Sequence, residues 1–142
     1  MAYLSGLVTP TRYHVRSSNP GGNVDNPHDL ARLVADALDD KKGLDITLLD
    51  VGDLFQITEV FVIVTGTSRP HVQTLAETVR EKLKDVDRKP LRSEGEAEGE
   101  WVLLDFGDVI VHIFQAETRD FYGLERLWGD ADSLVWEPAA SA

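Results

Sequence analysis

The residues best placed to do chemistry are Gly66, Thr67 and Ser68, which stand between an apolar run, VFVIVT, and a stretch of helical spacing. The first backbone N–H groups of a helix have no partners within the helix, so a helix N-terminus can hold an anion such as a phosphate. Serine and threonine are also common helix caps, because their side chains accept hydrogen bonds from these same N–H groups. The turn is therefore either a phosphate site or a capped helix start, and capping is the commoner arrangement.

The turn resembles the glycine-serine turn of nucleotidyltransferases, which would make the chain an enzyme or a nucleotide binder. Those enzymes also need carboxylates at alternate positions on the next strand, where two metal ions stabilise the attacking and leaving oxygens. The sequence has no such D-x-D pair there. Asp105 and Asp108 are three residues apart across a strand and a tight turn, so their side chains need not point together. The residues favour a capped helix, and we predict that the chain is not an enzyme.

Metal and cofactor motifs are also missing from the sequence. The chain has no cysteine, and its four histidines show no HExxH or other paired-ligand spacing. It has no GxSxG elbow, P-loop or dinucleotide-binding fingerprint. We therefore predict no catalytic residue, no metal site and no cofactor.

The net charge indicates what kind of partner the chain prefers. With 25 acidic and 14 basic residues, the formal charge is -11. This charge opposes binding to nucleic acid, which depends on clustered lysine and arginine, and favours docking onto a basic protein surface. No apolar run approaches the about 20 residues of a membrane span, and the N-terminus does not resemble a secretory signal. We expect a cytoplasmic protein with a basic protein partner, little direct RNA contact and no membrane contact.

The 142 residues suit a single domain, because domains of about 100–200 residues are common. Residues 1–26 differ from the rest, since they contain two arginines, a single acid and most of the turn-rich run SSNPGGNVDNP. We expect them to be a tail, either a flexible arm or an artefact of cloning or of the start site. The predicted domain covers residues 27–131, and residues 132–142 are expected to form a C-terminal tail.

Hydrophobic periodicity and turn residues predict the elements of the domain. Asn26 should cap a first helix that has Pro27 at its first position and Gly43 as its stop. Residues 45–51 have strand character, and residues 60–65 form a continuous apolar run that is typical of a strand buried on both faces. The other predicted elements are a helix capped by Thr67 or Ser68, a short edge strand at 90–92, a hairpin over 101–114 and a short helix or helix-like turn over 117–128. This order predicts an α/β fold, a single domain with a mixed β-sheet flanked by helices.

Gly107 and Asp108 predict a tight β-hairpin, because they separate the apolar runs WVLLDF and VIVHIF. Side-chain alternation then divides the ribbon into an apolar face, which should meet the core, and a mixed face. The apolar face comprises Val102, Leu104, Phe106, Val109, Val111 and Ile113. The mixed face comprises Trp101, Leu103, Asp105, Ile110, His112 and Phe114.

Asp105 and His112 are diagonal neighbours on the mixed face, so they could share a hydrogen bond. Two interpretations of this face stay open. The C-terminal segment could pack there, which would make Asp105 and His112 a satisfied structural pair. Alternatively, part of the face is a docking surface, for which aromatic anchors such as Trp101 and Trp128 are suited because tryptophan is enriched among interface hot spots.

The run WVLLDFGDVIVHIF followed by RDFYGLERLWGD resembles the ribosomal silencing factor family, also called Iojap-like proteins. The similarity extends upstream through DITLLDV, ITEVFVIVTGTS and the following helix, and so covers residues 28–131. It implies a homodimeric α/β domain of nucleotidyltransferase-like topology without the catalytic carboxylates. It also implies binding to the large ribosomal subunit through ribosomal protein L-fourteen, which blocks joining of the small subunit and represses translation when nutrients are scarce.

A protein that blocks subunit joining needs only to occupy a surface, so an acidic domain without catalytic residues fits this role. We hypothesise that the hairpin and the following segment supply the contact surface, with acids meeting basic side chains and aromatics burying apolar area. Arg119 could instead bond to an acid within the domain, and the aromatics could belong to the core or to a dimer interface. The candidate partner-binding residues are Trp101, Asp105, Asp108, Arg119, Tyr122, Glu125 and Trp128. The alternative functions are a nucleotidyltransferase-like enzyme or nucleotide binder and a large-subunit assembly factor.

Overall fold

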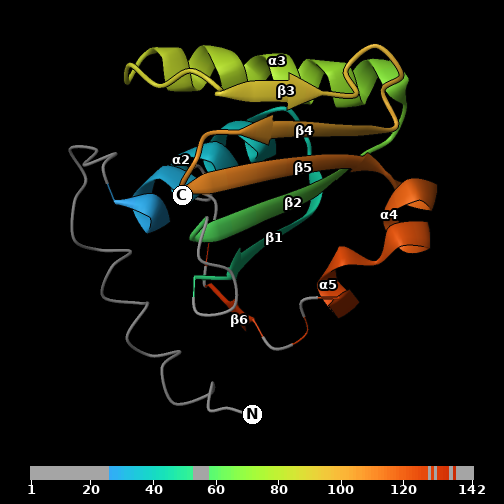
Figure 1. Ribbon diagram of the computed structural model, residues 1–142. Coiled ribbons are helices and arrows are strands. Elements are labelled where there is room, and N and C mark those ends of the chain that lie inside the picture. Colours follow the sequence, from blue (N-terminus) through green and yellow to red (C-terminus); the bar gives the residue numbers. More distant parts are fainter. Residues whose placement is uncertain (1–25, 53–57, 128, 130, 135, 137–142) are drawn as a thin grey trace.

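The computed structural model describes residues 26–52, 58–127, 129, 131–134 and 136 of the chain (Figure 1). In this part of the chain, six strands form one mixed sheet in the order β3-β4-β5-β2-β1-β6. β2 and β5 are parallel, and the other neighbours are antiparallel. The strands are β1 (Leu44–Asp50), β2 (Val60–Gly66), β3 (Arg92–Glu94), β4 (Trp101–Asp105), β5 (Val109–Gln115) and β6 (Asp132–Ser133). The single α/β domain with a mixed sheet that the sequence predicts is confirmed. Of the tail expected over residues 1–26, only Asn26 is described.

Helices lie against both faces of this sheet. The long helices α2 (Pro27–Asp40) and α3 (Arg69–Lys84) pack on one face, where their apolar stripes meet one side of the strands in the larger core cluster. The short helices α4 (Ala116–Tyr122) and α5 (Leu124–Leu127) follow β5 and lie beside the sheet in Figure 1. The second core cluster covers the opposite face of the strands and includes Leu124 of α5. None of the described helices combines the length and apolar character needed to cross a membrane.

β2 lies between β5 and β1, and this central position explains the continuous apolar run over residues 60–64. All seven of its residues are buried. Val60, Val62 and Val64 face the α2–α3 side, whereas Phe61 and Ile63 face the second cluster. A strand covered on both faces needs apolar side chains pointing both ways, so the prediction of a doubly buried strand is confirmed.

The ends of α2 show which capping signals were correct. The Asn26 side chain accepts hydrogen bonds from the backbone N–H groups of His28 and Asp29, at 2.8 and 3.4 Å, as the cap prediction requires. The predicted stop at Gly43 is wrong, because the helix ends at Asp40 and the left-handed residue is Lys42, with a φ of 67°. Gly43 instead permits close packing, since a Cβ there would lie 2.7 Å from Cγ2 of Val64.

The hairpin has the register that a turn of Gly107 and Asp108 predicts. Trp101 pairs with Phe114, and Leu103 pairs with His112. All six residues of the predicted apolar face are buried in the larger cluster. The edge strand predicted at 90–92 lies slightly later, at Arg92–Glu94, where it pairs with β4. The sequence pattern therefore places every side chain of the hairpin on the correct face.

The segment after β5 differs from its prediction in two ways. The helix expected over 117–128 is broken at Gly123, whose φ of 57° ends α4 in a left-handed residue before α5 begins. The described residues after 131 pack on the domain: β6 pairs with β1, and Leu134 is buried. The Trp136 indole N–H also donates to Oδ1 of Asp36 in α2, at 3.0 Å. These contacts place residues 132–134 and 136 with the domain and correct the expectation of a tail from residue 132.

Candidate partner-binding surface

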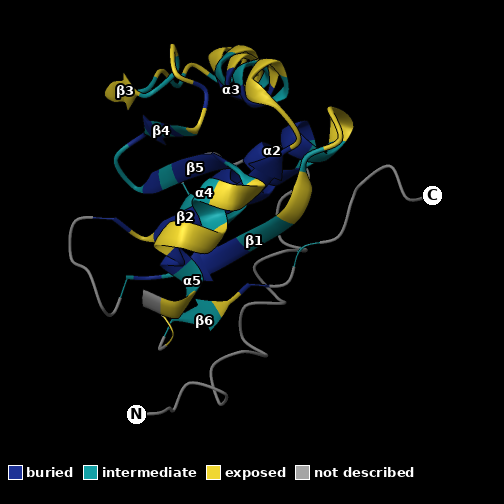
Figure 2. Cartoon of the chain, turned by 90° about the vertical axis from the view of Figure 1, so that its right-hand side faces the viewer, coloured by how far each residue is buried: buried dark blue, intermediate teal, exposed yellow. Residues whose placement is uncertain are grey.

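Three aromatic side chains form a continuous surface where β4 meets α4. Trp101 of β4 is half-buried, whereas Tyr122 and Phe121 of α4 are 51% and 78% exposed. The ring centroids of Trp101 and Tyr122 are 4.8 Å apart, and those of Tyr122 and Phe121 are 5.0 Å apart. We call Trp101, Phe121 and Tyr122 the aromatic surface. Figure 2 shows α4 facing the viewer with exposed residues in yellow. Large exposed aromatics of this kind are suited to binding another protein.

His112 lies beneath Trp101. It forms a hydrogen bond with Trp101 and not with Asp105, which was its predicted partner. The Trp101 indole N–H donates to Nδ1 of His112 at 3.1 Å, and the imidazole is only 5% exposed. The Asp105 carboxylate instead accepts from the Gly107 backbone N–H at 2.8 Å, which closes the hairpin turn, and from Arg92 at 3.2 Å. The predicted Asp105–His112 hydrogen bond is therefore wrong, because nearer donors at the turn occupy the carboxylate. Burial lowers the pKa of His112 to about 4, so the ring is neutral at neutral pH.

The acidic candidates on the hairpin lie apart from the aromatic surface. Asp105 and Asp108 stand at the turn, whereas Trp101 begins β4 about 13 Å away at the usual rise of a strand. Asp108 is already paired within the domain, since its carboxylate accepts from Arg88 at 2.8 Å. Both acids keep part of their surface exposed, so a basic partner could share them at the edge of an interface.

Arg119 holds α4 and α5 against the sheet. Its guanidinium donates to the Glu125 carboxylate at 2.7 Å, to Oγ1 of Thr65 at 2.8 Å and to Oγ1 of Thr47 at 3.2 Å. It also donates to the backbone carbonyl of Asp45 at 2.8 Å, within the irregular part of β1. The side chain is only 11% exposed. In the isolated chain Arg119 and Glu125 thus form a structural pair, which is the alternative that the sequence left open for Arg119.

The remaining candidate, Trp128, lies outside the described residues. Phe121 was missed by sequence reasoning although it is the most exposed of the large apolar side chains that are described. No local signal identifies it, because adjacent residues of a helix point about 100° apart and can both be buried, as Leu30 and Ala31 are in α2.

The Gly66–Ser68 turn is a capped helix start, and the backbone N–H groups of Thr67 and His71 already have partners there. Oγ of Ser68 accepts from the His71 backbone N–H at 3.2 Å. The Thr67 backbone N–H donates to Nδ1 of His71 at 2.9 Å, and Nε2 of the same ring lies 2.8 Å from the Lys41 carbonyl oxygen. A phosphate would have to displace these bonds. The geometry therefore supports capping over the phosphate site.

Gly66 serves packing, and we expect Gly66→Ala to lower the free energy of unfolding by about 1–3 kcal/mol. A Cβ at this position would lie 2.8 Å from Cγ2 and 3.2 Å from the backbone nitrogen of Val72, so strand and helix would have to separate. Urea unfolding measures the change. Gly52→Ala is the control, because its new methyl would meet only side-chain atoms, those of Glu59 and Asp50. Equal stability of Gly66→Ala and the wild type would contradict this packing role.

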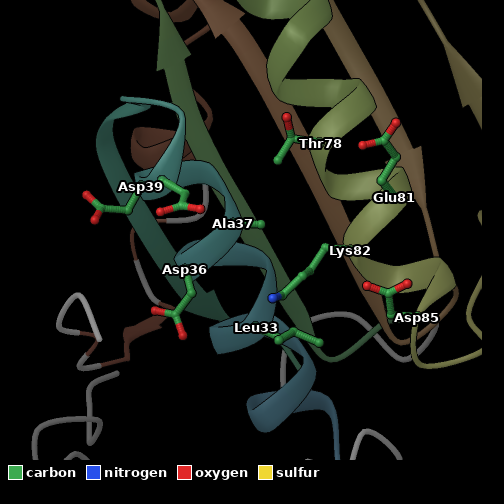
Figure 3. Close-up of a pocket in the computed structure, with 9 residues that line it drawn as sticks. Leu33, Asp36, Ala37, Asp39, Thr78, Glu81, Lys82 and Asp85 are labelled. Atoms are coloured by element: carbon green, nitrogen blue, oxygen red, sulfur yellow. The ribbon is translucent and has the colours of Figure 1, made fainter. Parts of the chain in front are cut away.

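A hollow of about 570 Å³ lies between α2 and α3, on the side of the sheet opposite the second cluster (Figure 3). Its described lining contains one basic side chain, Lys82, and several carboxylates. These acids are Asp36, Asp39, Asp40, Glu81 and Asp85. Such a lining repels the phosphates of a nucleotide. Among the described residues, no group of three acids or histidines has the arrangement of a metal site.

Similarity to known proteins agrees with this geometry. Residues 24–141 match the family described as "Ribosomal silencing factor during starvation". The ribosomal silencing factor of Chromobacterium violaceum is 42% identical over 101 residues, which cover 71% of this chain and 83% of that protein. The corresponding Bacillus subtilis protein is 37% identical over 106 residues, which cover 75% and 90% of the two chains.

Similarity also extends to a mouse protein and to a solved structure. The mouse protein is named "Mitochondrial assembly of ribosomal large subunit protein 1" and is 29% identical over 112 residues, which cover 77% of this chain and 49% of that protein. A crystal structure from Chromobacterium violaceum matches with a TM-score of 0.72 at 38% identity and covers 82% of this chain and 97% of that one. The chain therefore belongs to the ribosomal silencing factor family.

Proposed function

We propose that this protein binds the large ribosomal subunit through ribosomal protein L-fourteen and blocks joining of the small subunit, which represses translation in the cytoplasm. Membership of the silencing factor family supports a role on the ribosome. The observation that carries the contact is the aromatic surface, in which Tyr122 and Phe121 are exposed beside Trp101. A bound domain of this size excludes another particle sterically, so occupancy alone produces the effect.

The electrostatics support a protein contact over an RNA contact. The chain carries a formal charge of -11, and a negative field speeds docking onto a basic protein surface. The aromatic surface would supply the apolar centre of the interface, and Asp105 and Asp108 would lie toward its rim. Arg119 and Glu125 would act by holding α4 in position. The resemblance to the family also implies a homodimer, which stays a prediction.

Binding without catalysis is the function that the turn geometry favours. Two backbone donors at the Gly66–Ser68 turn, those of Thr67 and His71, are engaged by side chains, and the hollow between α2 and α3 is lined mostly by acids. Titration with nucleotide and magnesium distinguishes the nucleotidyltransferase-like alternative, because saturable binding with turnover would support an enzyme. The name of the mouse relative favours a second candidate, a role in large-subunit assembly. That role predicts immature large subunits in cells that lack the protein.

Removing the most exposed aromatic should weaken ribosome binding without unfolding the protein. We expect Phe121→Ser to reduce the affinity for purified large subunits by about tenfold or more, since a central aromatic anchor is worth at least this much. Because Phe121 is 78% exposed, the free energy of unfolding should change little. Co-sedimentation with large subunits measures the affinity.

Leu91→Ser is the matched control for this experiment. Leu91 is 75% exposed but lies near the hairpin turn, toward the proposed rim of the interface, so this variant should lose much less affinity than Phe121→Ser. A Phe121→Ser protein that binds as tightly as the wild type would remove the aromatic surface from the proposal. Wild-type protein that fails to reduce association of the two subunits at large excess would overturn the blocking role itself.

A further inference from the structure

His112 is a polar residue in an apolar environment. Its side chain lies on the face of the sheet covered by the second core cluster, among residues such as Phe61, Ile63 and Phe114. The imidazole is 5% exposed. In the described part of the chain its Nε2 atom has no hydrogen-bond partner. An apolar residue of similar size would fill this position without leaving a buried polar atom unpaired, so packing alone does not explain the histidine.

The contact with Trp101 defines the protonation of the ring. An indole N–H can only donate, so Nδ1 of His112, at 3.1 Å, must accept. The proton of the neutral ring therefore resides on Nε2, the atom without a partner. The hydrogen bond to Trp101 thus depends on one tautomer of His112, in which the protonated Nε2 atom has no partner among the described residues.

The same contact connects the core to the aromatic surface. Trp101 packs on Phe114 and on Tyr122, with ring centroids 4.8 Å apart in both pairs, and Tyr122 in turn contacts Phe121. The orientation of the indole therefore determines the support beneath the two exposed rings. Without an acceptor at position 112, the partly buried indole N–H would lose its partner and would be expected to turn toward solvent.

We propose that His112 is a positioning residue for partner binding: its Nδ1 atom fixes the Trp101 indole and thereby holds Tyr122 and Phe121 in the arrangement that docks on the large subunit. This inference rests on the proposed function for the identity of the partner, whereas the hydrogen bond between Trp101 and His112 is independent of it. His112 need not touch the partner. It acts by restricting the orientations of the aromatic side chains before binding, which lowers the entropy cost of ordering them in the complex.

A first test needs no substitution. Long-range ¹H–¹⁵N spectra of the full chain should show a neutral His112 with its proton on Nε2 at pH 7.5, together with a slowly exchanging indole N–H of Trp101. The indole signal is assigned by its loss in Trp101→Phe. A ring protonated on Nδ1 would overturn the proposal at once, because such a ring cannot accept from Trp101.

Two substitutions then separate positioning from packing. His112→Leu removes the acceptor, whereas the amide oxygen of His112→Asn can take the place of Nδ1. In the leucine variant we expect indole exchange to become about fivefold to tenfold faster and the affinity for purified large subunits to fall by a similar factor. The asparagine variant should recover most of both losses. Ile113→Val, on the opposite face of β5, is the control for a small loss of stability that leaves the surface unchanged.

The two readouts keep the inference and the proposed function distinguishable. Indole protection that is equal in the leucine variant and the wild type overturns the positioning role, whatever the binding result. An asparagine variant that binds no better than the leucine variant also overturns it. If wild-type protein does not bind large subunits, the proposed function fails, and the role of His112 in docking fails with it. The hydrogen bond between His112 and Trp101 is still tested, because indole exchange is measured without the ribosome.

Discussion

Replacing Arg119 with alanine is expected to lower the free energy of unfolding by about 2–4 kcal/mol, a large share of the stability of a domain of this size. The guanidinium is almost fully covered and joins α4 and α5 to two strands at once. Its loss leaves the Thr65 hydroxyl, the Asp45 carbonyl and the Glu125 carboxylate without their shared donor. Thr65 is buried, and a buried polar group that loses its hydrogen-bond partner is destabilising.

The pKa of Glu125 supports a stabilising contribution from the Arg119–Glu125 pair. Burial raises the pKa of this carboxyl, but hydrogen bonds from Arg119 and the backbone, with the charges of Arg119 and Arg126, outweigh burial and hold the pKa below its usual value. A carboxylate whose folded pKa is lowered stabilises the fold above its unfolded pKa and loses this contribution as the pH falls. The Arg119→Ala protein should therefore show a weaker loss of stability below pH 4.5 than the wild type.

Two variants control the Arg119 experiment, which is measured by urea unfolding. Arg119→Lys keeps the charge but cannot reproduce the fork of donors, so its loss should be intermediate. Arg92→Ala removes an arginine that is 57% exposed and pairs with Glu94 and Asp105 at the surface, so it should change stability by less than about 1 kcal/mol. Equal stability of the Arg119 and Arg92 alanine variants would contradict a structural role for Arg119.

The hairpin and β2 could be predicted because their information is local. Two turn residues between apolar runs determine the register, and alternation then assigns each side chain of β4 and β5 to a face. β2 is apolar at successive positions, which indicates burial on both sides wherever the strand lies. The cap at Asn26 is equally local, since its partners are two and three residues away.

The errors arise where distant segments meet. β6 pairs with β1, and Trp136 bonds to Asp36 one hundred residues earlier, so the end of the domain could not be found from the composition of the C-terminus. Gly43 was assigned to the helix stop, yet the contact that requires a glycine is with Val64 in β2. Periodicity along the chain contains no information about such contacts.

In the candidate site, too, features set by local sequence were predicted and features set by distant contacts were not. The hairpin register correctly placed Trp101, Asp105 and His112 on one face, but two diagonal neighbours compete for His112 and the sequence favoured the wrong one. Arginine is usually exposed, so the sequence indicates that Arg119 lies at the surface. Its structural role depends on Thr47 and Thr65, which are more than fifty residues away in the sequence. Exposure of Phe121 follows from how α4 packs, which the helical pattern alone does not determine.

His112 should make the protein lose stability in mild acid, before most carboxylates titrate. Burial lowers the pKa of this ring to about 4 from an ordinary value of 6.5. A histidine whose folded pKa is lowered stabilises the fold fully above its unfolded pKa and loses this contribution as the pH falls from 6.5 toward 4. The difference corresponds to about 3 kcal/mol, of which about 2 kcal/mol is lost by pH 5. Protonation also converts Nδ1 into a donor, which breaks the Trp101 bond.

Urea unfolding at pH 7.5 and pH 5 measures this loss, and His112→Asn isolates it. The asparagine does not titrate, so its free energy of unfolding should fall by about 2 kcal/mol less than that of the wild type over this range. Contributions from the other titratable groups are common to both proteins and cancel in the comparison. Parallel pH profiles for the two proteins would show that His112 takes up no proton on unfolding in this range. The ring would then be protonated to the same extent in the folded and unfolded states, and a protonated ring cannot accept a hydrogen bond from Trp101.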